Sequence, residues 1–275
     1  MNEATRNRHG FIGALASYAT MERRALSYIE TLPEPSRPVT LITERELENL
    51  PPVVQRYFKF SGVLGKPRID SFGIVMEGRI RQTKDSKWMS MVSRQYNSLS
   101  HRARVYFVCG KGTPMSGVDS YVNGKGRMEI KLFNLVSIAD VSGPEMDKSA
   151  LVTFLNDLVF CPTAYFSLPV EWKQIDTNHA SISLSNESIT VKATITFGSD
   201  GRIVNWESDD RFADVNGEQR RDIWSTPVER YEKIEGLCVP ASAHAVHNFD
   251  GNAYTYVELD KIRNLVCNID TLPDE

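Results

Sequence analysis

Residues 69–82 read IDSFGIVMEGRIRQ, and this stretch decides the fold because apolar and polar side chains alternate along it. The even positions carry Phe72, Ile74, Met76 and Ile80, and the odd positions carry Glu77, Arg79 and Arg81. A period of two is typical of a β-strand with one buried face. The stretch therefore predicts a sheet whose apolar side needs a cover.

Both neighbouring regions of the chain continue this pattern. Further strands are predicted at 86–96, 103–109, 116–122, 180–185, 188–197, 202–212, 228–249 and 253–265. Short turns rich in Gly, Asn and Asp join many of them, such as GSDG at 198–201. Turns this tight make antiparallel neighbours, because parallel pairing needs long crossover connections.

Helical spacing appears in the N-terminal region instead. Residues 11–32 place apolar side chains near one helical face, and a proline-rich linker follows at 32–39. Thr43 and Glu46 then have the spacing of a capping box, and a second short helix is predicted to stop at Gly62.

A central helix is predicted between the two β-rich regions, over residues 144–159. Apolar residues recur there at helical spacing, and Pro162 closes the segment. Ser142 and Glu145 have the spacing of a capping box, with Pro144 in the first turn. This gives Glu145 a sufficient structural role.

Together these elements predict an α+β fold: a strongly curved antiparallel β-sheet with N-terminal helices and one central helix packed against it. Residues 1–40 are expected to form an amphipathic helix and its proline-rich linker. Residues 41–275 are expected to form a single curved-sheet domain.

The composition limits the classes of function. The 275 residues are 41% hydrophobic and carry a net charge of −3, which is ordinary for a globular protein and argues against a general nucleic-acid binder. Between Lys66 and Lys131, however, 13 Lys and Arg residues stand against 5 Asp and Glu residues. This basic segment favours an anionic ligand or partner, or it consists of solvated strand faces.

Cysteine spacing and hydropathy bear on location. Cys109, Cys161, Cys238 and Cys267 lie far apart without paired spacing, so neither a disulfide framework nor a zinc site made of four cysteines is expected. No run approaches the roughly 18 apolar residues of a membrane span. The segment 11–20 continues into a charged helical pattern and is interpreted as an amphipathic helix instead of an export signal. A cytoplasmic location is expected.

Established catalytic motifs are missing from the sequence. It contains no phosphate-binding loop, dinucleotide fingerprint, nucleophile elbow or H-E-x-x-H motif, and no cofactor or metal is predicted. His244 and His247 are three residues apart in a predicted strand, so they should point to opposite faces and cannot chelate one metal locally.

Asp119 is the most informative polar residue of the predicted strands. It shares a strand face with Tyr121, while Val118 and Val122 occupy the other face. If the valines face the core, Asp119 is solvated. If the curved sheet leaves a cavity, Asp119 faces it as a carboxylate with a raised pKa. The predicted ligand-contacting residues are Trp88, Tyr96, Asp119, Tyr121 and Arg127.

Five pieces of the chain, in order, resemble a large bacterial family of uncharacterised proteins: NLPPVVQRYFKFSGVLGKPRI (49–69), DSYVNGKGRM (119–128), SGPEMD (142–147), FCPTAYF (160–166) and YEKIEGLCVPASAHAVHNFDG (231–251). The resemblance spans residues 47–262, and the family has no assigned activity. It matches the family at Trp88, Gln95, Asp119, Tyr121, Gly124, Gly126, Arg127, Gly143, Pro144, Glu145 and Pro162.

The resemblance implies a fold similar to the lipoprotein-carrier type of half-barrel, in which the sheet wraps helices and shelters an apolar cavity. Some family members carry an N-terminal membrane segment, and this sequence departs from them there. Fold-level similarity alone licenses little about function.

Three functions stay open at this point. The favoured one is non-enzymatic binding of a small apolar or amphipathic ligand in the half-barrel. The second is an enzyme that uses Asp119 as acid or base beside Tyr121, with Arg127 holding an anionic group. The third is a protein-interaction module that uses the basic surface of residues 66–131. A deep pocket lined by Asp119 would separate the first two from the third.

Overall fold

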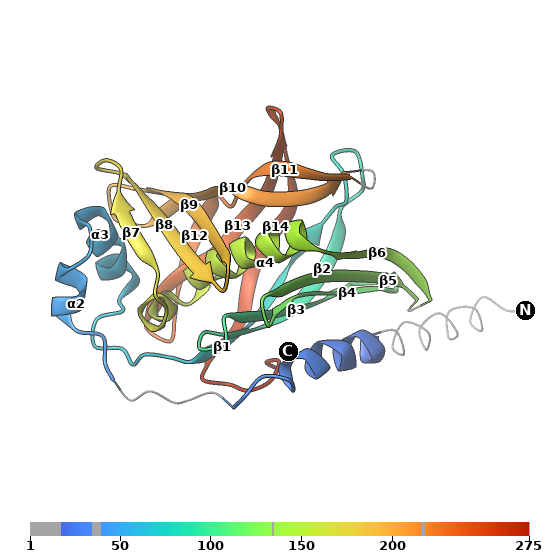
Figure 1. Ribbon diagram of the computed structural model, residues 1–275, viewed down its shortest axis with the longest axis horizontal. Helices are drawn as coiled ribbons and strands as arrows, with labels where there is room; N and C mark the ends of the chain where they lie inside the picture. Colours follow the sequence, from blue (N-terminus) through green and yellow to red (C-terminus); the bar gives the residue numbers. More distant parts are fainter. Residues whose placement is uncertain (1–17, 35–39, 134, 216–217, 275) are drawn as a thin grey trace, which may run out of the picture.

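Two antiparallel meanders, one from each half of the chain, meet where strand β1 (Ser71–Ile80) pairs with strand β14 (Asn252–Cys267). The computed structural model describes residues 18–34, 40–133, 135–215 and 218–274. Within these residues the meanders form one sheet that curls around a helix (Figure 1).

The first limb of the sheet comprises residues 71–142 and the second limb residues 171–267. Besides β1, the first limb contains β2 (Met89–Ser98), β3 (Ala103–Gly110), β4 (Met115–Val122), β5 (Lys125–Leu132) and β6 (Val136–Ser142). Besides β14, the second limb contains β7 (Glu171–Gln174), β8 (His179–Asn186), β9 (Ile189–Phe197), β10 (Ile203–Val215), β11 (Glu218–Ser225), β12 (Val228–Ile234) and β13 (Leu237–Phe249).

The spatial order of the strands is β6-β5-β4-β3-β2-β1-β14-β13-β11-β10-β9-β8-β7, with β12 paired to β13 off this path. Every pairing is antiparallel. The predicted α+β fold with a curved antiparallel sheet is therefore confirmed, although β5, β6, β7 and β11 were not among the predicted strands.

Helix α4 (Pro144–Asp157) lies inside the curl of the sheet. It contacts β4 and β5 of the first limb and β9 and β10 of the second, so it bridges the two limbs (Figure 1). The short 3₁₀ helices η1 (Leu158–Phe160) and η2 (Pro162–Ser167) continue from it. The main core lies on this concave side and includes Phe72 and Ile74 of β1 with Phe154 of α4.

Three further helical segments precede the sheet in sequence, and the second and third of them contribute side chains to the main core. Helix α2 (Glu44–Glu48) begins with the predicted capping box, in which Glu46 accepts a hydrogen bond of 2.9 Å from the backbone N–H of Thr43. Helix α3 (Pro52–Ser61) ends at Gly62 in the left-handed conformation, as predicted. The helical residues 18–29 pack on the convex face of the first limb.

Two parts of the predicted N-terminal region lie outside the described residues, namely 1–17 and 35–39. The predicted helix over 11–32 is therefore confirmed only for 18–29. The predicted division near residue 40 stays a prediction. Among the described helices, none has both the length and the apolar character to cross a membrane.

Strand β1 was predicted to be buried on one face, but both faces are buried from Ser71 to Met76. The second cover comes from the end of the chain. Pro273 lies so close to Gly73 that a β-carbon there would come within 2.9 Å of its ring, and its carbonyl accepts a hydrogen bond from Arg94. A pattern within one strand cannot reveal a cover supplied about 200 residues away in sequence.

The predicted capping box at the start of α4 is not formed. Gly143 is the N-cap residue, with Pro144 in the first turn, and Glu145 is exposed. The anchoring carboxylate is that of Asp147, which accepts hydrogen bonds from the backbone N–H of Gly126 (2.7 Å) and from Lys125 Nζ (2.9 Å).

Gly126 marks the closest approach between α4 and the first limb. A β-carbon at this position would lie 2.4 Å from the carbonyl oxygen of Met146 and 2.9 Å from Ala150 Cβ. The missing side chain therefore allows the helix backbone to rest on strand β5.

Replacing Gly126 with alanine is expected to lower the free energy of unfolding by about 1–3 kcal/mol, because the added methyl group forces the helix and the strand apart. Urea denaturation followed by circular dichroism measures this change. Lys125→Ala, which removes a surface ion pair one residue away, is the control and should cost less. Equal costs for the two variants would contradict the close approach.

Candidate functional site

The concave face of the first limb carries its inward-facing residues in rows that run across the strands. One row contains Ile74, Gln95, Tyr106, Asp119 and Met128. The next row contains Phe72, Asn97, Arg104, Tyr121 and Gly126. Polar groups therefore lie in the middle of an otherwise apolar face, opposite α4.

Arg104 is the centre of these polar groups. Its Nη1 donates a hydrogen bond to Asp119 Oδ2 (2.7 Å), and its Nε donates one to Asp157 Oδ2 (2.5 Å) of α4. Gln95 Nε2 also donates to Asp157 Oδ2, at 2.8 Å. The Arg104 side chain is only 5% exposed, so a buried cation joins the sheet to the helix.

Burial and charge shift the protonation of this cluster. Burial disfavours the charged form of Arg104, but Asp157 and Asp119 more than offset this and raise its pKa. Burial raises the pKa of Asp157, although Arg104 and Gln95 act in the opposite direction. Burial also raises the pKa of Tyr106 to about 12. Burial is thus the largest single influence on all three pKa values, because the cluster is shielded from water.

A cavity of about 220 Å³ lies between this face and α4. Both limbs contribute to it, with Met91, Val108, Ile130, Val257 and Leu259 among its apolar walls. Asp119 lines the cavity, and its Oδ1 is buried with no hydrogen-bond partner among the described residues. An unpartnered carboxylate oxygen in an apolar cavity is unfavourable unless something donates to it.

Of the five predicted ligand-contacting residues, the structure brings only Asp119 to this cavity. Tyr121 shares the face of Asp119, as predicted, but it is fully buried and its hydroxyl accepts a hydrogen bond from Asn186 Nδ2 (2.9 Å). The structure thus directs the Tyr121 hydroxyl to Asn186, whereas the Asp119 carboxylate pairs with Arg104.

Trp88 and Tyr96 belong to the opposite, convex side. Tyr96 packs in the outer apolar cluster with Met21 of the N-terminal helix. Trp88 precedes β2, and the guanidinium of Arg81 lies 4.5 Å from its ring. Trp88 therefore does not lie in the strand that contains Tyr96, and for Tyr96 strand parity could not tell which face is concave.

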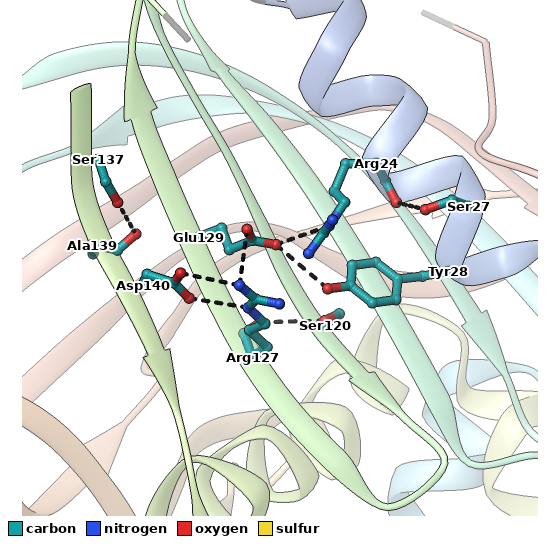
Figure 2. A network of polar contacts seen from close by, with 9 residues as sticks. All are labelled: Arg24, Ser27, Tyr28, Ser120, Arg127, Glu129, Ser137, Ala139 and Asp140. Atoms are coloured by element: carbon teal, nitrogen blue, oxygen red, sulfur yellow. Dashed lines mark hydrogen bonds and ion pairs between the residues drawn. The ribbon is translucent and has the colours of Figure 1, made fainter. Parts of the chain in front are cut away.

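Arg127 also lies on the convex side, as Figure 2 shows. It donates two hydrogen bonds of 3.0 Å to the carboxylate of Asp140 and lies 3.3 Å from Glu129. Glu129 in turn pairs with Arg24 of the N-terminal helix at 3.1 Å (Figure 2). This network ties the N-terminal helix to the sheet.

Sequence reasoning missed Arg104, Asp157 and Tyr106 as site residues. A signal existed in the segment ARVYFVC (103–109), where a charged residue interrupts an apolar strand. A second signal was an acidic residue within FLNDLVF (154–160). Charges at such positions are expected to be paired, but their partners depend on how α4 docks.

The basic segment of residues 66–131 is largely neutralised by the rest of the chain. Ion pairs join Arg68 to Glu46, Arg79 to Glu258, Arg94 to Glu22, Arg104 to Asp157, Lys125 to Asp147 and Arg127 to Asp140. The basic segment therefore pairs with acidic residues from other parts of the same chain.

The two neighbouring histidines contact different carboxylates. His244 Nε2 lies 2.7 Å from Glu229 Oε1, and His247 Nδ1 contacts Asp222. Over the described part of the chain, no three His, Cys, Asp or Glu side chains are grouped so that they could hold a metal ion.

The comparisons with known proteins identify the family. The model of a family of unknown function (DUF6544) matches residues 40–259, and the chain belongs to this family. The family predicted from the sequence pieces, one without an assigned activity, is thus confirmed. No curated protein matches the chain.

Two of the matching solved structures are of the lipoprotein-carrier type. One is a domain named for outer membrane lipoprotein sorting from Vibrio parahaemolyticus, with a TM-score of 0.38, 9% identity and coverage of 70% of this chain and 84% of that chain. The other is a LolA superfamily protein from Nitrosomonas europaea, with a TM-score of 0.41, 11% identity and coverage of 85% and 95%. Similarity at this level carries no information about the ligand.

Replacing Arg104 with methionine is expected to lower the free energy of unfolding by about 3–5 kcal/mol, because two carboxylates lose their buried cation. Arg127→Met is the matched control on the convex side. That ion pair is more than one-third exposed on the arginine side, so its loss should cost only about 0–1 kcal/mol. Urea denaturation measures both. A larger cost for Arg127→Met would contradict the assignment of Arg104 as the central cation.

Proposed function

We propose that this protein binds a small amphipathic ligand in the cavity between α4 and the concave face of the sheet. The observation that carries the proposal is an apolar cavity whose wall includes the unpartnered Oδ1 of Asp119. Apolar walls with a few placed polar groups are the usual composition of ligand sites.

The size of the cavity indicates the size of the ligand. Pockets for drug-sized ligands enclose about 300–1,000 Å³, and this one encloses about 220 Å³. A ligand with a short apolar body and few polar groups fits such a space. The apolar body would contact methionine and branched aliphatic side chains, and the flexible methionines adapt to different shapes.

Asp119 is the polar contact in this proposal. Its Oδ2 is held by Arg104, which leaves Oδ1 to accept a hydrogen bond from a hydroxyl or N–H group of the ligand. Because Arg104 fixes the carboxylate, the acceptor is already oriented before the ligand arrives.

The first test fills the cavity. Ala245 lines the cavity, and the phenyl ring of Ala245→Phe would occupy space that a ligand needs. The affinity for the neutral fluorescent probe N-phenylnaphthylamine is therefore expected to fall about tenfold or more, and tenfold corresponds to about 1.4 kcal/mol. Ala253→Phe adds the same ring at an exposed position of β14 and serves as the control. Circular dichroism checks that both variants fold. Unchanged probe binding in Ala245→Phe would refute the cavity as the site.

The second test concerns Asp119. Asp119→Ala should weaken the binding of decanol by about tenfold, because a hydrogen bond to a charged group contributes about 1.5–3 kcal/mol. Asp140→Ala removes a convex-side carboxylate and should leave the affinity unchanged. Titration calorimetry measures both. If Asp119→Ala lowers the melting temperature but spares decanol binding, the role of Asp119 is structural.

A further inference from the structure

Strand β10 contains an irregularity that turns one arginine into the cavity. Before it, Trp206 and Ser208 are buried at even positions, and Ser208 pairs with Trp224 of β11. After it, Arg211 pairs with Asp222, so the register shifts between Ser208 and Arg211. A β-bulge of this kind changes which residues face inward, and it places Arg211 on the cavity wall.

Helix α4 holds the backbone on both sides of Arg211. Before it, Asp210 pairs with Lys148 Nζ (2.6 Å) and accepts a hydrogen bond from the N–H of Lys192 (2.9 Å). After it, the N–H of Phe212 donates to the hydroxyl of Ser149 (2.8 Å). These contacts fix the bulge, and with it the direction of the Arg211 side chain.

The guanidinium of Arg211 has no anionic partner among the described residues. It lies 4.5 Å from the ring of Trp224, and its Nε and Nη1 are buried without a hydrogen-bond acceptor. The nearest carboxylate in the register, Asp222, is engaged elsewhere. One of its oxygens contacts His247 Nδ1, and the other accepts a hydrogen bond from the N–H of Asn248 (2.8 Å).

Two buried guanidinium nitrogens without an acceptor are costly, and a ligand anion would remove that cost. We propose that Arg211 binds the carboxylate of an anionic amphiphile, a medium-chain fatty acid by chemical class, whose apolar chain occupies the cavity. This inference rests on the proposed function and names a second polar contact, so the carboxylate at Arg211 and the hydroxyl or N–H donor at Asp119 Oδ1 belong to the same ligand.

The donor geometry favours a carboxylate. A carboxylate binds a guanidinium through two neighbouring N–H groups, as Asp140 does with Nε and Nη2 of Arg127. In Arg211 the unsatisfied Nε and Nη1 lie on different edges, and each shares its edge with Nη2, so either edge offers a carboxylate one donor that lacks an acceptor. The other arginine of the cavity wall, Arg104, is already neutralised by Asp119 and Asp157, so it offers no second cation for a doubly charged phosphate. The indole of Trp224 supports the guanidinium from one side and limits its movement.

Asp119 makes the opposite ligand charge the main competitor. A cationic amphiphile would place its ammonium group at Asp119 Oδ1, which also lacks a partner. The ion pairs already present favour the anionic ligand over the cationic one. Asp119 shares one buried cation with Asp157, whereas no ion pair of Arg211 is found within the described residues.

The experiment compares three probes with the same chain, namely decanoate, decanol and decylammonium, by titration calorimetry with the purified full-length protein near neutral pH. Wild-type protein should bind decanoate most tightly. Arg211→Met keeps an unbranched side chain over Trp224, and it should weaken decanoate binding by about tenfold or more while leaving decanol binding unchanged. Arg211→Lys should retain part of the preference for decanoate.

Arg221→Met is the matched control, because Arg221 lies on the other face of the same hairpin and pairs with Asp209 at 2.7 Å. It should leave the affinity for all three probes unchanged. Equal binding of decanoate and decanol, or tightest binding of decylammonium, would overturn the assignment of Arg211 and leave the proposed cavity function intact. If none of the three probes nor N-phenylnaphthylamine binds the wild-type protein, the proposed function itself fails.

Discussion

The pairing of β1 with β14 is the constraint on which the rest of the structure depends. The other strand pairs arise within one limb, mostly between neighbours in sequence, but this pair joins Val75 to Asn264 and Met76 to Ile262. Without it the two limbs would be separate sheets. It also forms part of the site, because Ile80 pairs with Val257 and both residues line the cavity. Such a long-range contact is formed at a high entropic cost, which the shared core must offset.

Much of the fold could be predicted from local patterns. Alternation located the strand faces, tight turns gave antiparallel neighbours, and the capping box at Thr43 and the glycine at 62 located short helices. The failures occurred where the deciding partner is distant in sequence. The second cover of β1 comes from the C-terminal segment, and α4 is anchored through Asp147 and Gly126 instead of through a local box at Ser142 and Glu145.

The candidate site was less predictable for the same reason. Strand parity placed Asp119 and Tyr121 on one face and Trp88 and Tyr96 on one face, but only the curvature of the sheet determines which face is concave. The cluster around Arg104 needs a helix to supply Asp157. The inward direction of Arg211 was harder still to predict from the sequence. The register of β10 shifts just before Arg211, and this shift reverses any parity argument that begins at Trp206.

Helix α4 couples the architecture to the chemistry of the cavity. On the first limb it rests against Gly126 and supplies Asp157 to Arg104. On the second limb, Lys148 and Ser149 hold the residues on either side of Arg211. The same helix therefore bridges the two limbs and orients polar groups of the cavity on both of them. A shift in the position of α4 would alter both the volume of the cavity and the direction of its charged side chains. The shape and the polarity of this site therefore depend on the same helix.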